Sequence, residues 1–273
     1  RLPECAFDSQ AKERLVSDIA PDLMPPVPDA AVRRLLDSGL EAAVMNTVTA
    51  RSNANSARAV RKAVKDASIA KIPKLEDANW AGGRRSNQCT LILTEGDSAK
   101  ALAMAGLSVV GRNQFGVFPL KGKVLNVRDL TPKAAVANTE VAALISILGL
   151  DFNKTYEECA PGELPLRYGH VMIMADQDTD GSHIKGLLVN VFHTFWPHLL
   201  HACDGSDSSF LQQFVTPVVK AKRGKQELQF FSIGAFNDWA ATQSSLAGWK
   251  TKYYKGLGTS TSAEGRAYFS DLA

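Results

Sequence analysis

Three carboxylates at alternate positions are the clearest chemical feature of this 273-residue chain. Asp176, Asp178 and Asp180 follow the apolar run 171–175, which predicts a buried β-strand. In open α/β sheets, ligand sites collect on the loops that leave the carboxyl ends of strands. Carboxylates this close repel one another unless a cation neutralises them, and hard divalent cations prefer oxygen ligands. The spacing therefore predicts a divalent metal site.

These acids have two other interpretations. Asp-x-Asp-x-Asp-Gly is also the first half of an EF-hand calcium loop, which needs Glu at position 12. Counted from Asp176, position 12 is Leu187, so the EF-hand interpretation fails. A solvated acidic turn is common, but it does not explain why a buried strand leads directly into the acids.

A second acid has the same setting. Residues 89–94 predict another buried strand, Glu95 follows it, and residues 99–107 predict a helix. Adjacent parallel strands would bring Glu95 close to the acids that begin at Asp176. Four carboxylates could then hold two metal ions roughly 3.5–4 Å apart, a geometry used for in-line phosphoryl transfer.

The surrounding elements are predicted from apolar spacing and from turn residues. Ser182 is a candidate N-cap for a helix over residues 184–200. Further helices are predicted over residues 29–50, 132–149 and 263–273. A hairpin is predicted from strands at 214–220 and 228–232, with its turn at Arg223 and Gly224. The pattern is that of an α/β protein.

Composition excludes several classes of protein. A hydrophobic content of 45% and a charged content of 22% are globular values. The net charge is only +3, so any contact with nucleic acid must come from local patches. The sequence contains no apolar run of about 18 residues, so it predicts no membrane span. The four cysteines form no Cys-x-x-Cys pair, which indicates a reducing compartment. The spacing of His193, His198, His201 and Cys203 does not match a zinc site.

A compact basic loop covers residues 121–128. The stretch from Gly116 to Lys123 is not a Walker A loop, because Val124 stands where Ser or Thr is needed. Contact with a phosphate backbone is one interpretation of this loop. A solvated basic hairpin is the other, and the segment alone leaves both open.

Four motifs occur in order along the chain, namely Glu95–Ala99, Pro119–Asn126, Asp176–His183 and Tyr254–Gly258. Together they resemble the Toprim region of type IIA DNA topoisomerases. Three longer matches are similar to the eukaryotic topoisomerase II type, namely Val109–Arg112, Ile184–Leu188 and Lys255–Ser262. The resemblance covers nearly the whole chain.

This resemblance implies an α/β Toprim fold, in which a Rossmann-like parallel sheet with flanking helices follows the helical end of a transducer. Residues 1–75 would form the end of the ATPase and transducer region, and residues 76–87 a linker. Residues 88–273 would form the Toprim domain with its C-terminal extension. An insertion near residues 204–209 departs from the usual family length.

The resemblance also implies roles for individual residues in DNA cleavage and religation. Glu95 and Asp176 would hold a catalytic Mg²⁺ at the leaving 3′-oxygen, and Asp176 and Asp178 would hold a second ion. Asp180 would support this site, and Mn²⁺ or Ca²⁺ could replace Mg²⁺. DNA contacts are implied for Lys121, which replaces a common Arg, and for Lys123, Asn126, His183 and Lys185. The attacking tyrosine would lie beyond residue 273.

The implied parent enzyme is an ATP-dependent homodimer that acts on double-stranded DNA by strand passage, with most dimer contacts outside this chain. Gln10-Ala11-Lys12 matches a family loop that reaches the ATP γ-phosphate, with Ala in place of Thr, so Gln10 and Lys12 are ATP-binding candidates. We expect a nuclear protein, or alternatively one in a mitochondrion or another DNA-containing organelle, and no membrane partner. The fragment alone is expected to be inactive. A Toprim primase or nuclease and a noncatalytic DNA-binding scaffold are the alternatives.

Overall fold

A computed structural model describes most of the chain and divides it into two compact units, residues 1–55 and 56–273. The described residues are 27–39, 43–45, 47–48, 58–63, 69–157, 164–201, 209–243, 245–270 and 272. Gln10, Lys12 and nearly all of the predicted insertion at 204–209 lie outside them. In the first unit, helix α1 covers Asp29–Asp37, and residues 43–45 and 47–48 are also helical. The helical prediction for 29–50 is confirmed at these positions.

A four-stranded parallel sheet organises the second unit, in the order β2-β1-β3-β4. Its strands are β1 Thr90–Glu95, β2 Phe115–Leu120, β3 His170–Met174 and β4 Leu211–Gln213. Thr94 of β1 pairs with Met174 of β3, so Glu95 and the residues after Met174 leave the same edge of the sheet. The predicted α/β class and the predicted adjacency of the two acidic strands are confirmed.

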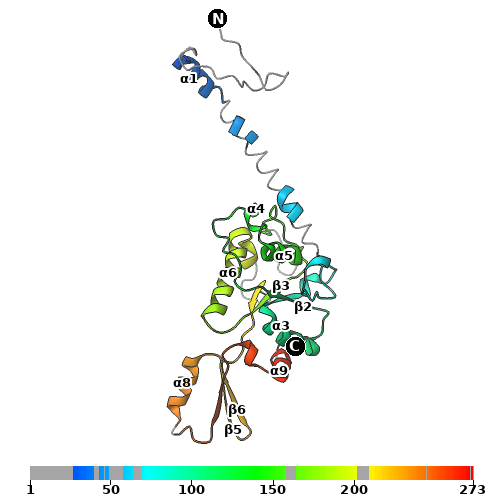
Figure 1. The fold of residues 1–273 in the computed structure, drawn as a ribbon, viewed down its shortest axis with the longest axis vertical. Coiled ribbons are helices and arrows are strands. Elements are labelled where there is room, and N and C mark those ends of the chain that lie inside the picture. Colours follow the sequence, from blue (N-terminus) through cyan, green and yellow to red (C-terminus); the bar gives the residue numbers. More distant parts are fainter. Residues whose placement is uncertain are drawn as a thin grey trace. The chain divides into compact units, whose positions relative to one another are not determined.

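Helices cover both faces of this sheet, which explains its continuous apolar strands. Alternate residues of β1 point to opposite faces, so Leu91 and Leu93 enter one core and Ile92 enters the other. Figure 1 shows α5 and α6 on one side of the strands and α3 and α9 on the other. These helices span α3 Gly96–Val110, α5 Thr139–Leu148, α6 Thr179–Phe195 and α9 Ser262–Ser270.

Two helix predictions were wrong in their boundaries. The single helix expected over 132–149 is two helices, α4 Pro132–Ala135 and α5, because the Asn138 side chain accepts the N–H groups of the first turn of α5. The helix expected over 184–200 begins earlier, and its N-cap is Asp178, not Ser182. It ends at Phe195, and the short helix α7, His198–His201, follows Pro197.

The segment predicted as a linker, residues 76–87, is held against the parallel sheet. Glu76 forms a β-bridge with Val117, and its N–H donates to the Val117 carbonyl at 2.9 Å. The Ala78 N–H donates to the Tyr168 hydroxyl at 2.9 Å, and Ala78 is buried. The 3₁₀ turn η2, Ile69–Lys71, precedes this segment, and η3, Ser86–Gln88, overlaps its end.

A smaller antiparallel sheet of order β6-β5-β7 follows, with α8 beside it (Figure 1). Its elements are β5 Val219–Arg223, β6 Gln226–Phe230, α8 Ile233–Thr242 and β7 Lys250–Tyr253. The predicted hairpin is confirmed, and its turn contains Gly224, whose φ of 61° suits glycine. The predicted strand 214–220 begins only at Val219, and the separate strand β4 at residues 211–213 belongs to the parallel sheet. In the described part of the chain, no helix is both long and apolar enough to span a bilayer.

Candidate metal site and its basic rim

Glu95 and Asp176 meet where two neighbouring strands end. The Asp176 N–H donates a hydrogen bond to Glu95 Oε2 at 3.1 Å. Gly96 follows Glu95 with φ of 78°, a left-handed conformation that suits glycine and lets α3 begin immediately after the strand. The two acids are 81 residues apart in sequence, so the parallel pairing of β1 and β3 alone brings them together.

Asp178 and Asp180 lie at the start of α6. Asp178 Oδ1 accepts the Gly181 N–H at 2.9 Å, which caps the helix. Asp180 lies in the first turn of α6, where the positive end of the helix dipole stabilises its negative charge. Its Oδ1 is 3.0 Å from Lys123 Nζ of the basic loop. The structure thus places the acidic turn beside one of the predicted DNA-binding lysines.

The shifted pKa of Glu95 reports on this crowding. Burial raises the pKa of Glu95, and the negative charges of Asp176, Asp178 and Asp180 raise it further. The hydrogen bond from the Asp176 N–H acts in the opposite direction without cancelling the shift. Burial and the neighbouring carboxylates therefore disfavour the ionised form of Glu95.

A turn from the C-terminal region, residues 254–261, closes over Asp176. The Leu257 N–H donates to Asp176 Oδ1 at 2.7 Å. Gly256 lies so close that a Cβ added there would be 2.1 Å from Asp176 Oδ2. In the sequence, Tyr254–Gly258 matched a family motif, but that match did not place this turn at the acids, so this contact was missed.

The basic loop that carries Lys121, Lys123 and Asn126 is fixed through its backbone. The Lys121 N–H donates to Glu140 Oε2 at 3.1 Å, and the Val127 N–H donates to Asn190 Oδ1 at 3.1 Å. These bonds attach the loop to α5 and α6, while the side chains of Lys121, Lys123 and Asn126 are exposed. On α6, His183 is exposed and Lys185 is half-buried.

Comparison with known proteins identifies the family to which this region belongs. The Toprim domain family matches residues 90–206, and the C-terminal associated domain of TOPRIM matches residues 214–273. The chain is 46% identical to human DNA topoisomerase 2-alpha over 273 residues, and the match covers 97% of this chain. It is 54% identical to chicken DNA topoisomerase 2-beta over 210 residues, and that match covers 77% of this chain. The chain spans only 17% and 12% of the lengths of these two relatives.

A solved structure agrees with the sequence matches. The crystal structure of the DNA-binding, cleavage and re-ligation domain of Plasmodium falciparum topoisomerase II superposes with a TM-score of 0.68 at 54% identity. The match covers 74% of this chain and 26% of that one. This chain is a Toprim region of the eukaryotic topoisomerase II type.

The acids of this Toprim region have the donor chemistry that Mg²⁺ prefers, but their side chains do not form a ready-made cage. Among the described residues, no three His, Cys, Asp or Glu side chains are close enough together to hold a metal ion. Three of these carboxylates have other partners, because Asp176 accepts from Leu257, Asp178 caps α6 and Asp180 pairs with Lys123. Each carboxylate keeps oxygen lone pairs beyond those that these hydrogen-bond donors use, so its chemistry suits a divalent cation.

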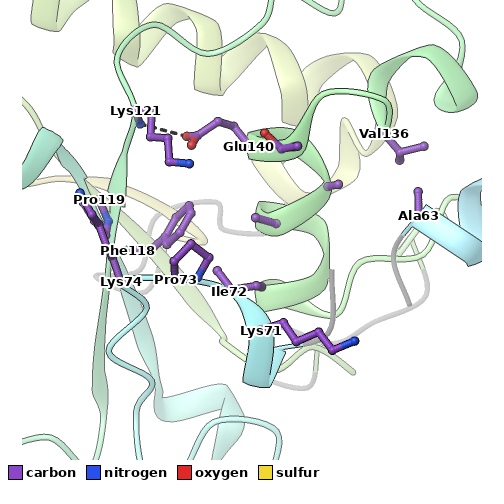
Figure 2. Close-up of a pocket in the computed structure, with 13 residues that line it drawn as sticks. Ala63, Lys71, Ile72, Pro73, Lys74, Phe118, Pro119, Lys121, Val136 and Glu140 are labelled. Carbon is purple, nitrogen blue, oxygen red and sulfur yellow. Dashed lines mark hydrogen bonds between the residues drawn. The ribbon is translucent and has the colours of Figure 1, made fainter. Parts of the chain in front are cut away.

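Two other groups of side chains in the Toprim region are separate from this site. His198 Nε2 is 2.7 Å from Glu157 Oε1, an ion-pair geometry and not a zinc site. A pocket of about 320 Å³ lies between β2, α5 and the segment near Ile72 (Figure 2). Its lining is mostly apolar, and it shares Lys121 with the basic loop but includes none of the four predicted metal ligands.

Proposed function

We propose that this chain supplies the acidic, metal-binding half of the double-strand cleavage and religation site of a type II DNA topoisomerase. The observation that carries the proposal is the parallel pairing of β1 with β3, which brings Glu95 and Asp176 within hydrogen-bonding distance. Glu95, Asp176 and Asp178 are the proposed catalytic residues and metal ligands, and Asp180 supports them. Mg²⁺ bound here would stabilise negative charge on the leaving 3′-oxygen.

Each carboxylate has a defined task in this proposal. Glu95 and Asp176, which the paired strands β1 and β3 bring together, would hold the ion nearest the chemistry. Asp176 and Asp178 share the second ion, which would neutralise a neighbouring phosphate. Mn²⁺ or Ca²⁺ could take the place of Mg²⁺ with the same oxygen ligands.

The basic rim would hold the DNA backbone beside the acids. Lys121, Lys123 and Asn126 approach from the loop that α5 and α6 anchor, and His183 and Lys185 approach from α6. Lys123 is the link between the two parts, because its ammonium pairs with Asp180. Phosphate contacts of this kind position a duplex and carry no sequence information themselves.

The nucleophile would come from outside this chain. Tyr253 is 57% exposed on β7, and Tyr254 is buried with its hydroxyl donating to Glu264. Burial and the Glu264 carboxylate raise the pKa of Tyr254, which disfavours the phenolate. The proposed parent enzyme is an ATP-dependent homodimer in the nucleus, or alternatively in an organelle, with Gln10 and Lys12 as its ATP contacts in this segment.

The test is DNA cleavage by the parent protein that contains this chain and the downstream tyrosine. Asp176→Asn should lower metal-dependent cleavage at least 100-fold while DNA binding changes only a few-fold. Asp97→Asn is the matched control, because Asp97 is an exposed acid in the first turn of α3 that pairs with Lys74. Equal cleavage by the wild type and Asp176→Asn would contradict the proposal.

A further inference from the structure

The carboxylate of Glu264 helps to cap the N-terminus of α9. The Thr261 N–H donates to Glu264 Oε2 at 2.8 Å, and the Thr261 hydroxyl does so at 3.1 Å. In return, the Glu264 N–H donates to Thr261 Oγ1 at 3.2 Å. This reciprocal pair is a capping box, a local device that begins a helix. Capping alone would be a sufficient role for an ordinary glutamate in this position.

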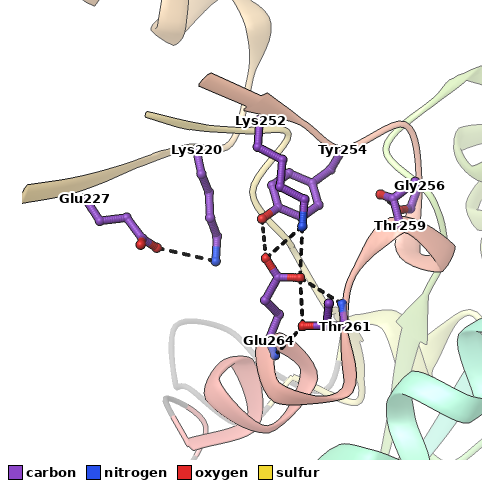
Figure 3. Close-up of polar contacts among 8 residues, drawn as sticks. All are labelled: Lys220, Glu227, Lys252, Tyr254, Gly256, Thr259, Thr261 and Glu264. Atoms are coloured by element: carbon purple, nitrogen blue, oxygen red, sulfur yellow. Dashed lines mark hydrogen bonds and ion pairs between the residues drawn. The ribbon is translucent and has the colours of Figure 1, made fainter. Parts of the chain in front are cut away.

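The same carboxylate also reaches the other end of the turn. The Tyr254 hydroxyl donates to Glu264 Oε1, and Lys252 Nζ lies 3.1 Å from Oε1 and 3.2 Å from Oε2. Figure 3 shows these partners converging on Glu264 from β7 and from the start of α9. Glu264 therefore joins Lys252 and Tyr254, at the start of the turn 254–261, to Thr261 at its end, a task that helix capping does not require.

The charge of Glu264 suits this role. Burial by itself would raise the pKa of Glu264, but the hydrogen bonds from Thr261, Tyr254 and Lys252 outweigh burial and lower the pKa to about 2. The carboxylate is therefore ionised at neutral pH, and charged acceptors form the stronger hydrogen bonds. Its side chain is 21% exposed, so solvent screens these bonds only in part.

The segment held between these two ends lies on Asp176. The Leu257 N–H donates to Asp176 Oδ1, and the Leu257 side chain is buried in the core beside α3 and α9. Gly256 contributes a surface without a side chain, against which the Asp176 carboxylate packs. Together these contacts determine where the Asp176 oxygens point.

We propose that Glu264 is a positioning residue for the metal site: by closing the turn 254–261, it holds the Leu257 N–H against Asp176 and so orients that carboxylate for the cation. The inference rests on the proposed function, because it assumes that Asp176 is a ligand. Partners that orient metal ligands from outside the coordination sphere commonly change metal affinity by about 10–100-fold when they are mutated.

The test compares Glu264→Gln with Glu227→Gln in the 273-residue chain. Gln keeps the shape of Glu264 but cannot accept from all of its donors. Glu227 is the matched control, because it pairs with Lys220 at 3.6 Å on the neighbouring hairpin and has no bond to the turn in Figure 3. Mn²⁺ is the probe, and broadening of the Glu95 and Asp176 amides by NMR reports its binding. Hydrogen exchange of the Leu257 amide reports the turn without metal.

We expect Glu264→Gln to weaken Mn²⁺ binding about 10-fold and to accelerate Leu257 exchange, and Glu227→Gln to change neither. Tyr254→Phe keeps the buried ring, loses one donor and should shift both readouts in the same direction by less. Unchanged Mn²⁺ affinity in Glu264→Gln would overturn the inference, with or without faster exchange at Leu257. Failure of the proposed function is distinguishable, because the wild type would then show no Mn²⁺ broadening at Asp176 before any variant is compared.

Discussion

Glu95 and Glu264 are both partly buried glutamates, yet their pKa values shift in opposite directions. Burial and three neighbouring carboxylates raise the pKa of Glu95. At Glu264 the same burial is outweighed by donors from Thr261, Tyr254 and Lys252, and the pKa falls to about 2. The comparison teaches that hydrogen-bond donors favour the charged form of Glu264, whereas burial and neighbouring negative charge disfavour the charged form of Glu95. The Glu264 carboxylate is thus satisfied within the fold, and Glu95 belongs to the metal site proposed above.

The broadest expected effect, on both stability and metal affinity, comes from Gly256, where the turn 254–261 contacts Asp176. In Gly256→Ala the new Cβ would lie 2.1 Å from Asp176 Oδ2, so either the turn or the carboxylate must move. We expect the free energy of unfolding to fall by about 1–3 kcal/mol, the usual cost of overpacking, and Mn²⁺ affinity to fall at least tenfold. Chemical denaturation and Mn²⁺ titration measure the two effects.

Gly258→Ala is the control for that substitution. The nearest atom to a Cβ at Gly258 is Ser98 Cβ at 3.9 Å, which is ordinary contact. Both variants replace glycine by alanine within the same turn, so the unfolded chain changes equally. Equal denaturation midpoints for the two would show that the close approach at Gly256 costs nothing.

Removal of the Glu264 charge should lower stability by an amount that depends on pH. The folded pKa of about 2 lies below the ordinary value of 4.5, so the stabilisation is present above pH 4.5 and is lost as pH falls toward 2. The shift corresponds to on the order of 3 kcal/mol. The wild type should therefore be more stable than Glu264→Gln at pH 6, and this difference should shrink between pH 5 and pH 2. A difference that stays constant with pH would argue against an ionised Glu264.

The contribution of Glu95 to stability should depend on pH in the opposite direction. A folded pKa above the ordinary value means that protonation favours folding, so this contribution is present below pH 4.5 and is lost as pH rises through the folded pKa. Glu95→Gln should therefore raise the melting temperature slightly at pH 7 in the presence of EDTA. Mg²⁺ should stabilise the wild type more than the variant. Destabilisation of the metal-free protein by Glu95→Gln would contradict the crowding of charge at this edge.

The smallest stability effect is expected at Lys123. Its ion pair with Asp180 is exposed on both sides, so Lys123→Ala should change the free energy of unfolding by less than about 0.5 kcal/mol. DNA binding by the parent protein is the informative measurement, because loss of one phosphate contact should reduce the salt dependence of binding by about one ion. An unchanged salt dependence would contradict a contact between Lys123 and a DNA phosphate.

The sequence was sufficient for the features that depend on neighbouring residues. Apolar runs followed directly by an acid identified β1 and β3, and parallel sheets collect such loop ends at one edge, so the meeting of Glu95 and Asp176 was predictable. The choice of N-cap was not, because Asp176, Asp178, Asp180 and Ser182 are all residues that can cap a helix. Only the backbone geometry assigns the cap to Asp178.

The contact between Leu257 and Asp176 shows what local patterns leave out. These residues are 81 positions apart, and the N–H of a leucine carries no signal in the sequence. A clue did exist in Thr261-Ser-Ala-Glu264, which has the spacing of a capping box and marks the start of α9. It locates the helix but not the tertiary position of the turn before it, since packing of Leu257 and Phe269 on α3 decides that position.

The most direct test of the central claim is a Mn²⁺ titration of the 273-residue chain, followed through paramagnetic broadening of its backbone amides by NMR. The metal site proposed here requires the Glu95 and Asp176 amides to broaden together at the same Mn²⁺ concentration, and Asp176→Ala to remove both effects. Broadening confined to residues 176–180, with the Glu95 amide unaffected, would contradict a single site shared by the ends of β1 and β3.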